Sequence, residues 1–127
     1  MSMDAGGVLQ KIECDFSICK VENIKQIDLS REFVFMSKTP DEISVVCETD
    51  YIPPNAIAFE SGWKALKVSG ELDFSLIGII AKIADILAKT EISIFVISTF
   101  NTDYILIKAE NLDRSIHALE CNGYSVK

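Results

Sequence analysis

The sequence predicts an α+β fold in which helices cover one face of an antiparallel sheet. Residues 92–98 and 104–107 are two runs rich in β-branched and aromatic side chains, joined by a short polar loop, which is typical of a strand hairpin. Residues 76–89 carry apolar side chains at three- and four-residue spacing, which predicts an amphipathic helix that lies across a sheet. The chain has 127 residues, of which 49% are hydrophobic. That is enough for one ordinary domain or two very small ones that share a core.

The N-terminal half of the chain is predicted as strands with weak or missing helices. Residues 32–38 and 43–48 are β-branched and aromatic, and the turn at 39–42 joins them into a hairpin because its proline presets the backbone. Residues 8–21 alternate in polarity and predict a strand with one apolar face. That face carries the even-numbered side chains Val8, Ile12, Cys14, Phe16 and Ile18.

A proline-containing stretch marks the one clear boundary in the sequence. Residues 51–55 contain two adjacent prolines, which lack the N–H groups that a central strand requires. Residues 56–62 then predict one short helical turn. We therefore expect two units, a degenerate N-terminal unit over residues 1–61 and a better-formed C-terminal unit over residues 62–127.

The C-terminal half is predicted as strand, helix, strand, strand, helix, strand. Residues 63–72 form the opening strand, and the first helix follows with Gly78 inside it, where glycine costs about 1 kcal/mol relative to alanine. A close approach of another backbone or a ligand would explain this glycine. Residues 112–121 form the second helix, which Glu110 and Asn111 cap and Asn122 and Gly123 end, and residues 124–126 form the last strand. This order is the ferredoxin-like βαββαβ arrangement.

The loop at residues 99–103 concentrates hydrogen-bonding groups between two predicted strands. It presents hydroxyls, an amide, a carboxylate and one aromatic ring. A polar hairpin turn accounts for these residue types, since Asn, Asp and Thr are common in turns. For Asp103, turn closure and binding of an ammonium group are equally well supported. For Phe100, an aromatic side chain at a loop tip favours a lid or a dimer contact.

Composition and charge exclude several classes of function. The formal net charge is −7 and the pI is about 4.6, which argues against nucleic acid or an anionic membrane as a partner. No run approaches the ~20 apolar residues of a membrane span, and the N-terminus resembles no secretory signal, so we expect a cytoplasmic protein. The four cysteines include no C-x-x-C pair and there is one histidine, so we expect reduced thiols, no metal site and no cofactor.

Several sequence blocks together resemble the ACT-domain superfamily. Within it, the chain is similar to small tandem-ACT proteins related to aspartokinase regulatory domains and to the cytosolic arginine sensors of animals. The resemblance covers roughly residues 32–126. It rests on four blocks: a turn with the strand after it at residues 39–46, an opening strand at 63–68, a helix start at 78–81 and the hairpin at 92–106.

The resemblance implies a regulatory, non-catalytic module that binds an amino acid at an interface between ACT units, such as the interface of a homodimer. The residues that match ligand-binding positions of the family are Asp73, Phe74, Ser93, Ile94, Thr99, Phe100 and Asp103. A helix N-terminus attracts the carboxylate of an amino acid, and an acidic side chain attracts its ammonium group. One position departs from the family, because Leu76 stands where an arginine-sensing relative has a carboxylate.

Two other classes of function remain open at this point. A structural or partner-binding unit could keep the fold without the ligand, and Leu76 and the thin N-terminal half support that alternative. An enzyme has the least support. His117 is the only histidine and lies on a predicted helix away from the loop, and Cys47 has no base near it in the sequence.

Overall fold

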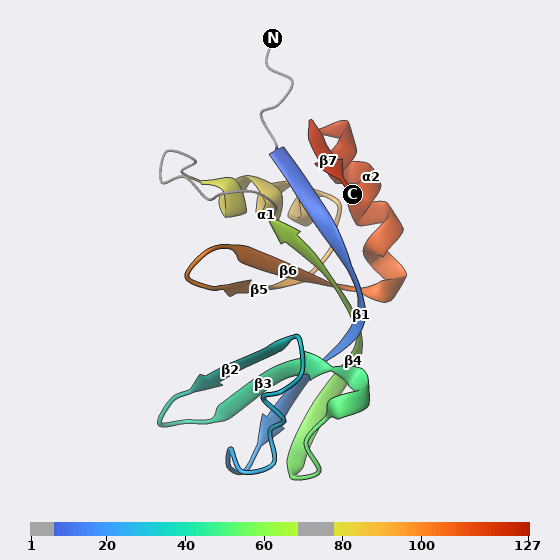
Figure 1. Cartoon of the computed structure of the whole chain (residues 1–127). Coiled ribbons are helices and arrows are strands. Elements are labelled where there is room, and N and C mark those ends of the chain that lie inside the picture. Colours follow the sequence, from blue (N-terminus) through green and yellow to red (C-terminus); the bar gives the residue numbers. More distant parts are fainter. Residues whose placement is uncertain (1–6, 69–77) are drawn as a thin grey trace. The chain divides into compact units, whose positions relative to one another are not determined.

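The computed structural model describes residues 7–68 and 78–127, which form seven strands and two α-helices (Figure 1). The elements are β1 (Gly7–Val21), β2 (Val34–Lys38), β3 (Ile43–Glu48), the 3₁₀ turn η1 (Thr49–Tyr51), β4 (Ala56–Val68), α1 (Ile79–Lys89), β5 (Ile94–Ser98), β6 (Asp103–Lys108), the 3₁₀ turn η2 (Ala109–Asn111), α2 (Leu112–Cys121) and β7 (Tyr124–Val126).

The chain divides into two compact units, which we describe separately. The strand unit comprises Cys14–Trp63, and the helical unit comprises the described residues of 1–13 and 64–127. β1 and β4 each contribute residues to both units. The predicted boundary between residues 61 and 62 stays a prediction, although residues 7–13 pack with the C-terminal half.

The sheet of the helical unit contains one strand more than the expected order. In sheet order its strands are β7, β1, β4, β6 and β5. β5 and β6 pair antiparallel from Ile94 opposite Ile107 to Ser98 opposite Asp103. β1 pairs in parallel with β7, with Leu9 opposite Val126, so the start of the chain separates β7 from β4. The predicted α+β class is confirmed, and this inserted strand is the difference.

Both α-helices of the helical unit cover the same sheet face, because their side chains enter one core. Ile83 and Leu87 of α1 and Leu119 of α2 are buried in this core. The sheet contributes Leu9, Leu66, Val68, Ile105 and Ile107, and Ile92 and Tyr124 complete the cluster. Burial of so many aliphatic side chains is the main stabilising term for this unit.

The strand unit has no α-helix and encloses a smaller core. Its buried cluster is Cys19, Val45 and Cys47, onto which Ile27, Val34, Ile52 and Ala56 pack. β3 pairs antiparallel with both β1 and β2, so it lies between them. The Ser17 hydroxyl is buried and makes hydrogen bonds with Thr49 Oγ1 at 2.9 Å and Ser61 Oγ at 2.7 Å. These contacts join β1, η1 and β4.

Two predictions for the strand unit were wrong. Residues 56–62 are the first half of β4 and not a helical turn. The turn at residues 53–56 closes where the Ala56 N–H donates to the Pro53 carbonyl oxygen at 3.0 Å, and β4 begins at Ala56. β1 does not have a single apolar face, since Leu9, Cys19 and Val21 are buried on the odd-numbered side. The odd-numbered side supplies Leu9 to the core of the helical unit and Cys19 to that of the strand unit, while Phe16 is buried on the even-numbered side.

The start of α1 also differs from its prediction. Gly78 is not inside the helix but is its N-cap, with φ of 82° and ψ of 13°. Among the described residues, a Cβ atom at Gly78 would meet nothing within 4 Å. Its left-handed backbone explains this glycine, because that conformation strains other residues. Leu76, and the predicted helix turn that contains it, lie outside the described residues.

The two ends of α2 agree with the sequence in part. Gly123 follows the helix with φ of 95°, which confirms the predicted left-handed stop. Asn111 is the N-cap residue, as predicted, but its side chain makes no capping bond. Its amide oxygen instead accepts a hydrogen bond from Arg114 Nη2 at 3.2 Å.

Candidate functional site

The β5–β6 hairpin closes tightly around a four-residue loop, Thr99 to Thr102. The Thr99 N–H donates to the Thr102 carbonyl oxygen at 2.7 Å, and the Thr99 hydroxyl donates to the same oxygen at 2.9 Å. The Thr102 N–H in turn donates to Thr99 Oγ1 at 3.2 Å. The loop is therefore held by its own backbone and hydroxyl groups, as expected for a threonine-rich turn.

Asp103 is the first residue of β6, and its carboxylate is almost buried. The residue is 8% exposed, and Asp103 Oδ1 accepts a hydrogen bond from Ser98 Oγ at 2.5 Å. Ser98 and Asp103 are also cross-strand partners in the β5–β6 ladder. The turn-closing role proposed for Asp103 therefore has a defined contact, and the carboxylate stays at the edge of the loop where a cation could meet it.

The hairpin loop adjoins the end of β4. The buried Thr102 hydroxyl donates to the Val68 carbonyl oxygen at 2.6 Å. Val68 is the last residue of β4, and Gly78 begins α1 after it. The end of the sheet at which the hairpin loop lies is thus also the end at which β4 finishes, before α1.

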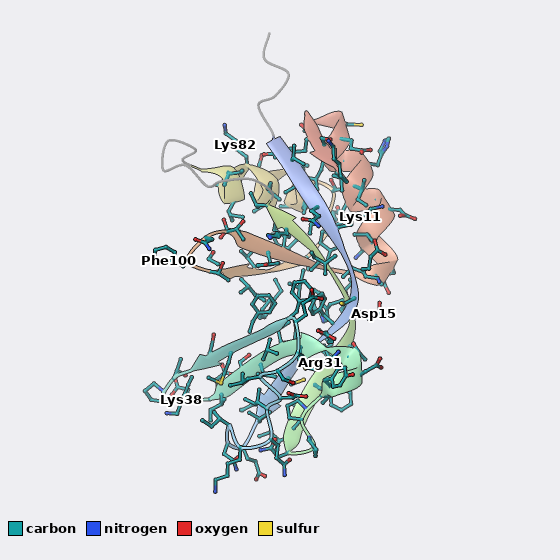
Figure 2. All side chains as sticks on the ribbon, in the orientation of Figure 1. Lys11, Asp15, Arg31, Lys38, Lys82 and Phe100 are labelled. Carbon is teal, nitrogen blue, oxygen red and sulfur yellow. The ribbon has the colours of Figure 1, made fainter. Side chains whose placement is uncertain are left out.

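Phe100 occupies the tip of the hairpin and contacts little. It is 102% exposed, as expected for a side chain that extends fully into solvent. Figure 2 shows its ring at the outer end of the hairpin, directed away from the helical unit. An aromatic ring in this position is available to a ligand or to another protein.

The other predicted site residues lie elsewhere. Ser93 is exposed and precedes β5, which begins at Ile94 and not at Ile92 as predicted. Ser93 and Ile94 are at one end of β5 and the hairpin loop is at the other, about 14 Å away for a five-residue strand. Asp73 and Phe74 lie outside the described residues. Within one chain, the structure brings together Thr99, Phe100 and Asp103.

Two residues of the site were missed by the prediction. Ser98 holds the Asp103 carboxylate, and Thr102 fixes the loop to β4. The sequence carried a usable signal for Ser98. If residues 99–102 form the hairpin loop, the two residues that flank it, Ser98 and Asp103, lie opposite each other. The sequence carried none for Thr102, since its partner is a backbone carbonyl 34 residues away in the chain.

Thiol groups form a second chemical feature, in the strand unit. Cys19 and Cys47 are both buried and free, and burial raises the pKa of each thiol above its ordinary value. For Cys47, burial together with the charge of the neighbouring Cys19 raises the pKa to about 12. The pair is therefore fully protonated at neutral pH and unreactive as nucleophiles.

His117 and Cys121 face each other on the surface of α2. Their side chains are exposed, and Cys121 Sγ lies 3.6 Å from His117 Nε2. His117 lies on a helix, α2, as predicted. The described part of the chain holds no group of three or more potential metal-ligating His, Cys, Asp or Glu side chains. In that same part, no helix has the length and hydropathy needed to cross a membrane.

Sequence comparison identifies the family. Residues 58–121 match the sequence model of the ACT domain, and this match covers half of the chain. The chain belongs to the ACT-domain family. The matched segment begins in β4 and ends in α2, so it contains α1 and the whole hairpin.

Solved structures agree with ACT membership. A protein from Agrobacterium tumefaciens superposes with a TM-score of 0.85 at 30% identity, covering 94% of this chain and 91% of that chain. The regulatory subunit of aspartate kinase from Thermus thermophilus superposes with a TM-score of 0.63 at 10% identity, covering 89% of this chain and 95% of that chain. The second likeness shows a shared fold.

Curated ACT-related sequences include a sensor. The human "cytosolic arginine sensor for mTORC1 subunit 1" is 37% identical over 59 residues, which is 46% of this chain. The bovine sensor matches at the same level. The aligned part spans 18% of the length of these sensors.

Proposed function

We propose that this ACT-domain chain is a regulatory module that binds a free amino acid at an interface between two ACT units. The observation that carries the proposal is the closed hairpin, which holds an almost buried Asp103 carboxylate beside an exposed Phe100 within the ACT-matched segment. A carboxylate suits the ammonium group of the ligand, and the ring suits its side chain. The similarity to a sensor named for arginine supports an amino acid as the ligand class.

A second copy of the chain would complete the site. Among the described strands β5 is the last of the sheet, so one of its edges pairs with no described strand. If two β5 strands paired antiparallel around Val96, Ile94 of one chain would lie opposite Ser98 of its partner. Ser93 and Ile94 would then approach Thr99 and Asp103 of the other chain, which a single chain keeps at opposite ends of β5. A two-fold dimer of this kind has two identical sites.

Thermal denaturation against each of the twenty amino acids tests ligand binding. A ligand present at 100 times its Kd stabilises the folded state by about 2.7 kcal/mol, which shifts the midpoint by several degrees in a chain of this size. We expect one amino acid or one chemical group of them to give this shift. Asp103→Asn should abolish it, while Asp85→Asn, at an exposed carboxylate paired with Lys89 on α1, should leave it unchanged.

Mixing two variants tests whether the site is shared. We expect Ser93→Trp and Asp103→Asn each to lose binding when purified alone. Mixed dimers of the two contain one site with both changes and one intact site, so binding should return to part of the population. Recovery on mixing is not expected if each chain binds the ligand by itself.

A module that binds a partner protein without an amino acid is the second candidate, and the complete exposure of Phe100 favours it. Absence of any shift with all twenty amino acids would support this candidate over the first. Phe100→Ser should then weaken partner binding without lowering the stability of the chain, because the ring makes no buried contact.

A further inference from the structure

The first half of β4 has an open edge within the strand unit. β4 lies between β1 and β6 in the sheet, but it has 13 residues and β6 has six. The Thr102–Val68 hydrogen bond aligns the start of β6 with the last residue of β4. β6 therefore pairs along the second half of β4, and among the described strands Ala56–Gly62 has β1 as its one neighbour.

This open edge is apolar. Ile57 and Phe59 are 57% and 61% exposed, and residues two apart in a strand share one side. Natural proteins protect open strand edges with lysine, proline or a bulge. Residues 56–61 contain neither lysine nor proline, and the protective features, Pro54 and the left-handed Gly62 with φ of 89°, lie at the two ends of this stretch. Ala56–Gly62 is thus an edge that can accept another strand.

The negative charge of the strand unit favours a basic partner strand over an acidic one. Cys14–Trp63 contains nine carboxylates and four basic side chains, a formal charge of −5, whereas the described residues of the helical unit contain eight basic and seven acidic side chains. A second copy would bring the same negative charge to this edge, which opposes self-pairing, while a cationic strand would be attracted.

We propose that the Ala56–Gly62 edge of β4 binds an extended peptide segment of a partner protein, in which basic side chains alternate with apolar ones. The peptide backbone would continue the sheet, as in other cases of strand addition. Its apolar side chains would pack on Ile57 and Phe59, and its basic side chains would face the acidic strand unit. This surface would give an ACT module a means of contacting a target.

The test uses two short labelled peptides with the same alternation of valine and charge, one with lysine and one with glutamate. Fluorescence anisotropy should show saturable binding of the lysine peptide that weakens with added salt, and no binding of the glutamate peptide. Phe59→Lys and Ile57→Lys should each weaken binding about tenfold or more, as for anchors at the centre of an interface. Leu29→Lys is the matched control, because Leu29 is 72% exposed in the same unit and the charge change is identical.

Four results would overturn the proposal. Equal weakening by Leu29→Lys and Phe59→Lys would mean that the peptide responds to overall charge and has no defined edge. Equal binding of the glutamate peptide would contradict the charge argument. Absence of binding of either peptide by the folded protein would contradict the site itself. A change of oligomeric state in Phe59→Lys, measured by analytical ultracentrifugation, would show that a second copy occupies the edge. Phe59→Lys changes no residue of the proposed amino-acid site, so a variant that keeps its oligomeric state should keep amino-acid binding, and the two proposals fail separately.

Discussion

Thr102 shows how one hydroxyl positions the hairpin. It is 5% exposed, and its Oγ1 atom donates to the backbone of β4 at 2.6 Å. In Thr102→Val the shape is kept but the Val68 carbonyl loses its donor. We expect the free energy of unfolding to fall by about 1–2 kcal/mol, measured by urea denaturation. Thr102→Ser retains the hydroxyl and should recover most of that loss. Equal destabilisation by both variants would mean that the methyl group matters and the hydrogen bond does not.

The raised pKa of Cys47 predicts that the stability of the chain falls as the pH rises in the alkaline range. This pKa is about 12 in the folded chain and 9.0 for an ordinary thiol. Above pH 9 the unfolded chain loses this proton first, so stability that is present below pH 9 is lost as the pH rises toward 12. The slope reaches at most about 1.4 kcal/mol per pH unit.

Replacing the thiol isolates this effect. Urea denaturation between pH 8 and 11 should give a shallower loss of stability in Cys47→Ala than in the unsubstituted chain, whatever its stability at pH 8. Cys121→Ala removes an exposed thiol and should keep the original slope. Parallel slopes for all three proteins would show that Cys47 ionises normally in the folded state.

For Gly78→Ala at the start of α1, the sequence and the structure predict opposite changes in stability. With Gly78 inside a helix, Gly78→Ala would stabilise the chain by about 1 kcal/mol. With Gly78 at φ of 82°, the same change strains the backbone and should destabilise the chain by about 1 kcal/mol. Gly78→Asn, which tolerates this conformation better, should lose less. Thermal melting of the three proteins decides between the two.

The elements that sequence predicts well are those defined by local pattern. The β5–β6 hairpin, β3, α2 and the left-handed stop at Gly123 follow from side-chain alternation, helical spacing and turn residues, and the structure has them. Residues 56–62 were mistaken for a helical turn because Ala56 to Phe59 are all apolar, so no alternation of apolar and polar residues marks the strand. The loop of the site was predictable for the same reason that the hairpin was, whereas the Thr102–Val68 contact joins distant segments and has no local pattern.

In the molecule as a whole, the position of β1 is what local pattern cannot supply. Its first residues pair with β7 and its last residues pair with β3, so one strand serves two units. On its odd-numbered side Leu9 enters one core and Cys19 the other, while Phe16 is buried on the even-numbered side. The βαββαβ order predicted from residues 63–126 was complete without β1. Only pairing between the two ends of the chain shows that another strand lies between β4 and β7.

This insertion predicts that residues 62–127 do not fold stably alone. Without β1 the core loses Leu9, and β7 loses its partner strand and the hydrogen bond from the Lys127 N–H to the Leu9 carbonyl oxygen, 2.8 Å in length. We expect a fragment of residues 62–127 to melt without a cooperative transition in circular dichroism. Joining residues 7–13 to its C-terminus by a flexible linker, long enough to run back along β7, should restore the transition. Leu9→Ala in that permuted chain should lower its stability by about 2–5 kcal/mol. A cooperative transition in the fragment alone would mean instead that β7 can pair directly with β4, and that the C-terminal ACT unit is independent of the start of the chain.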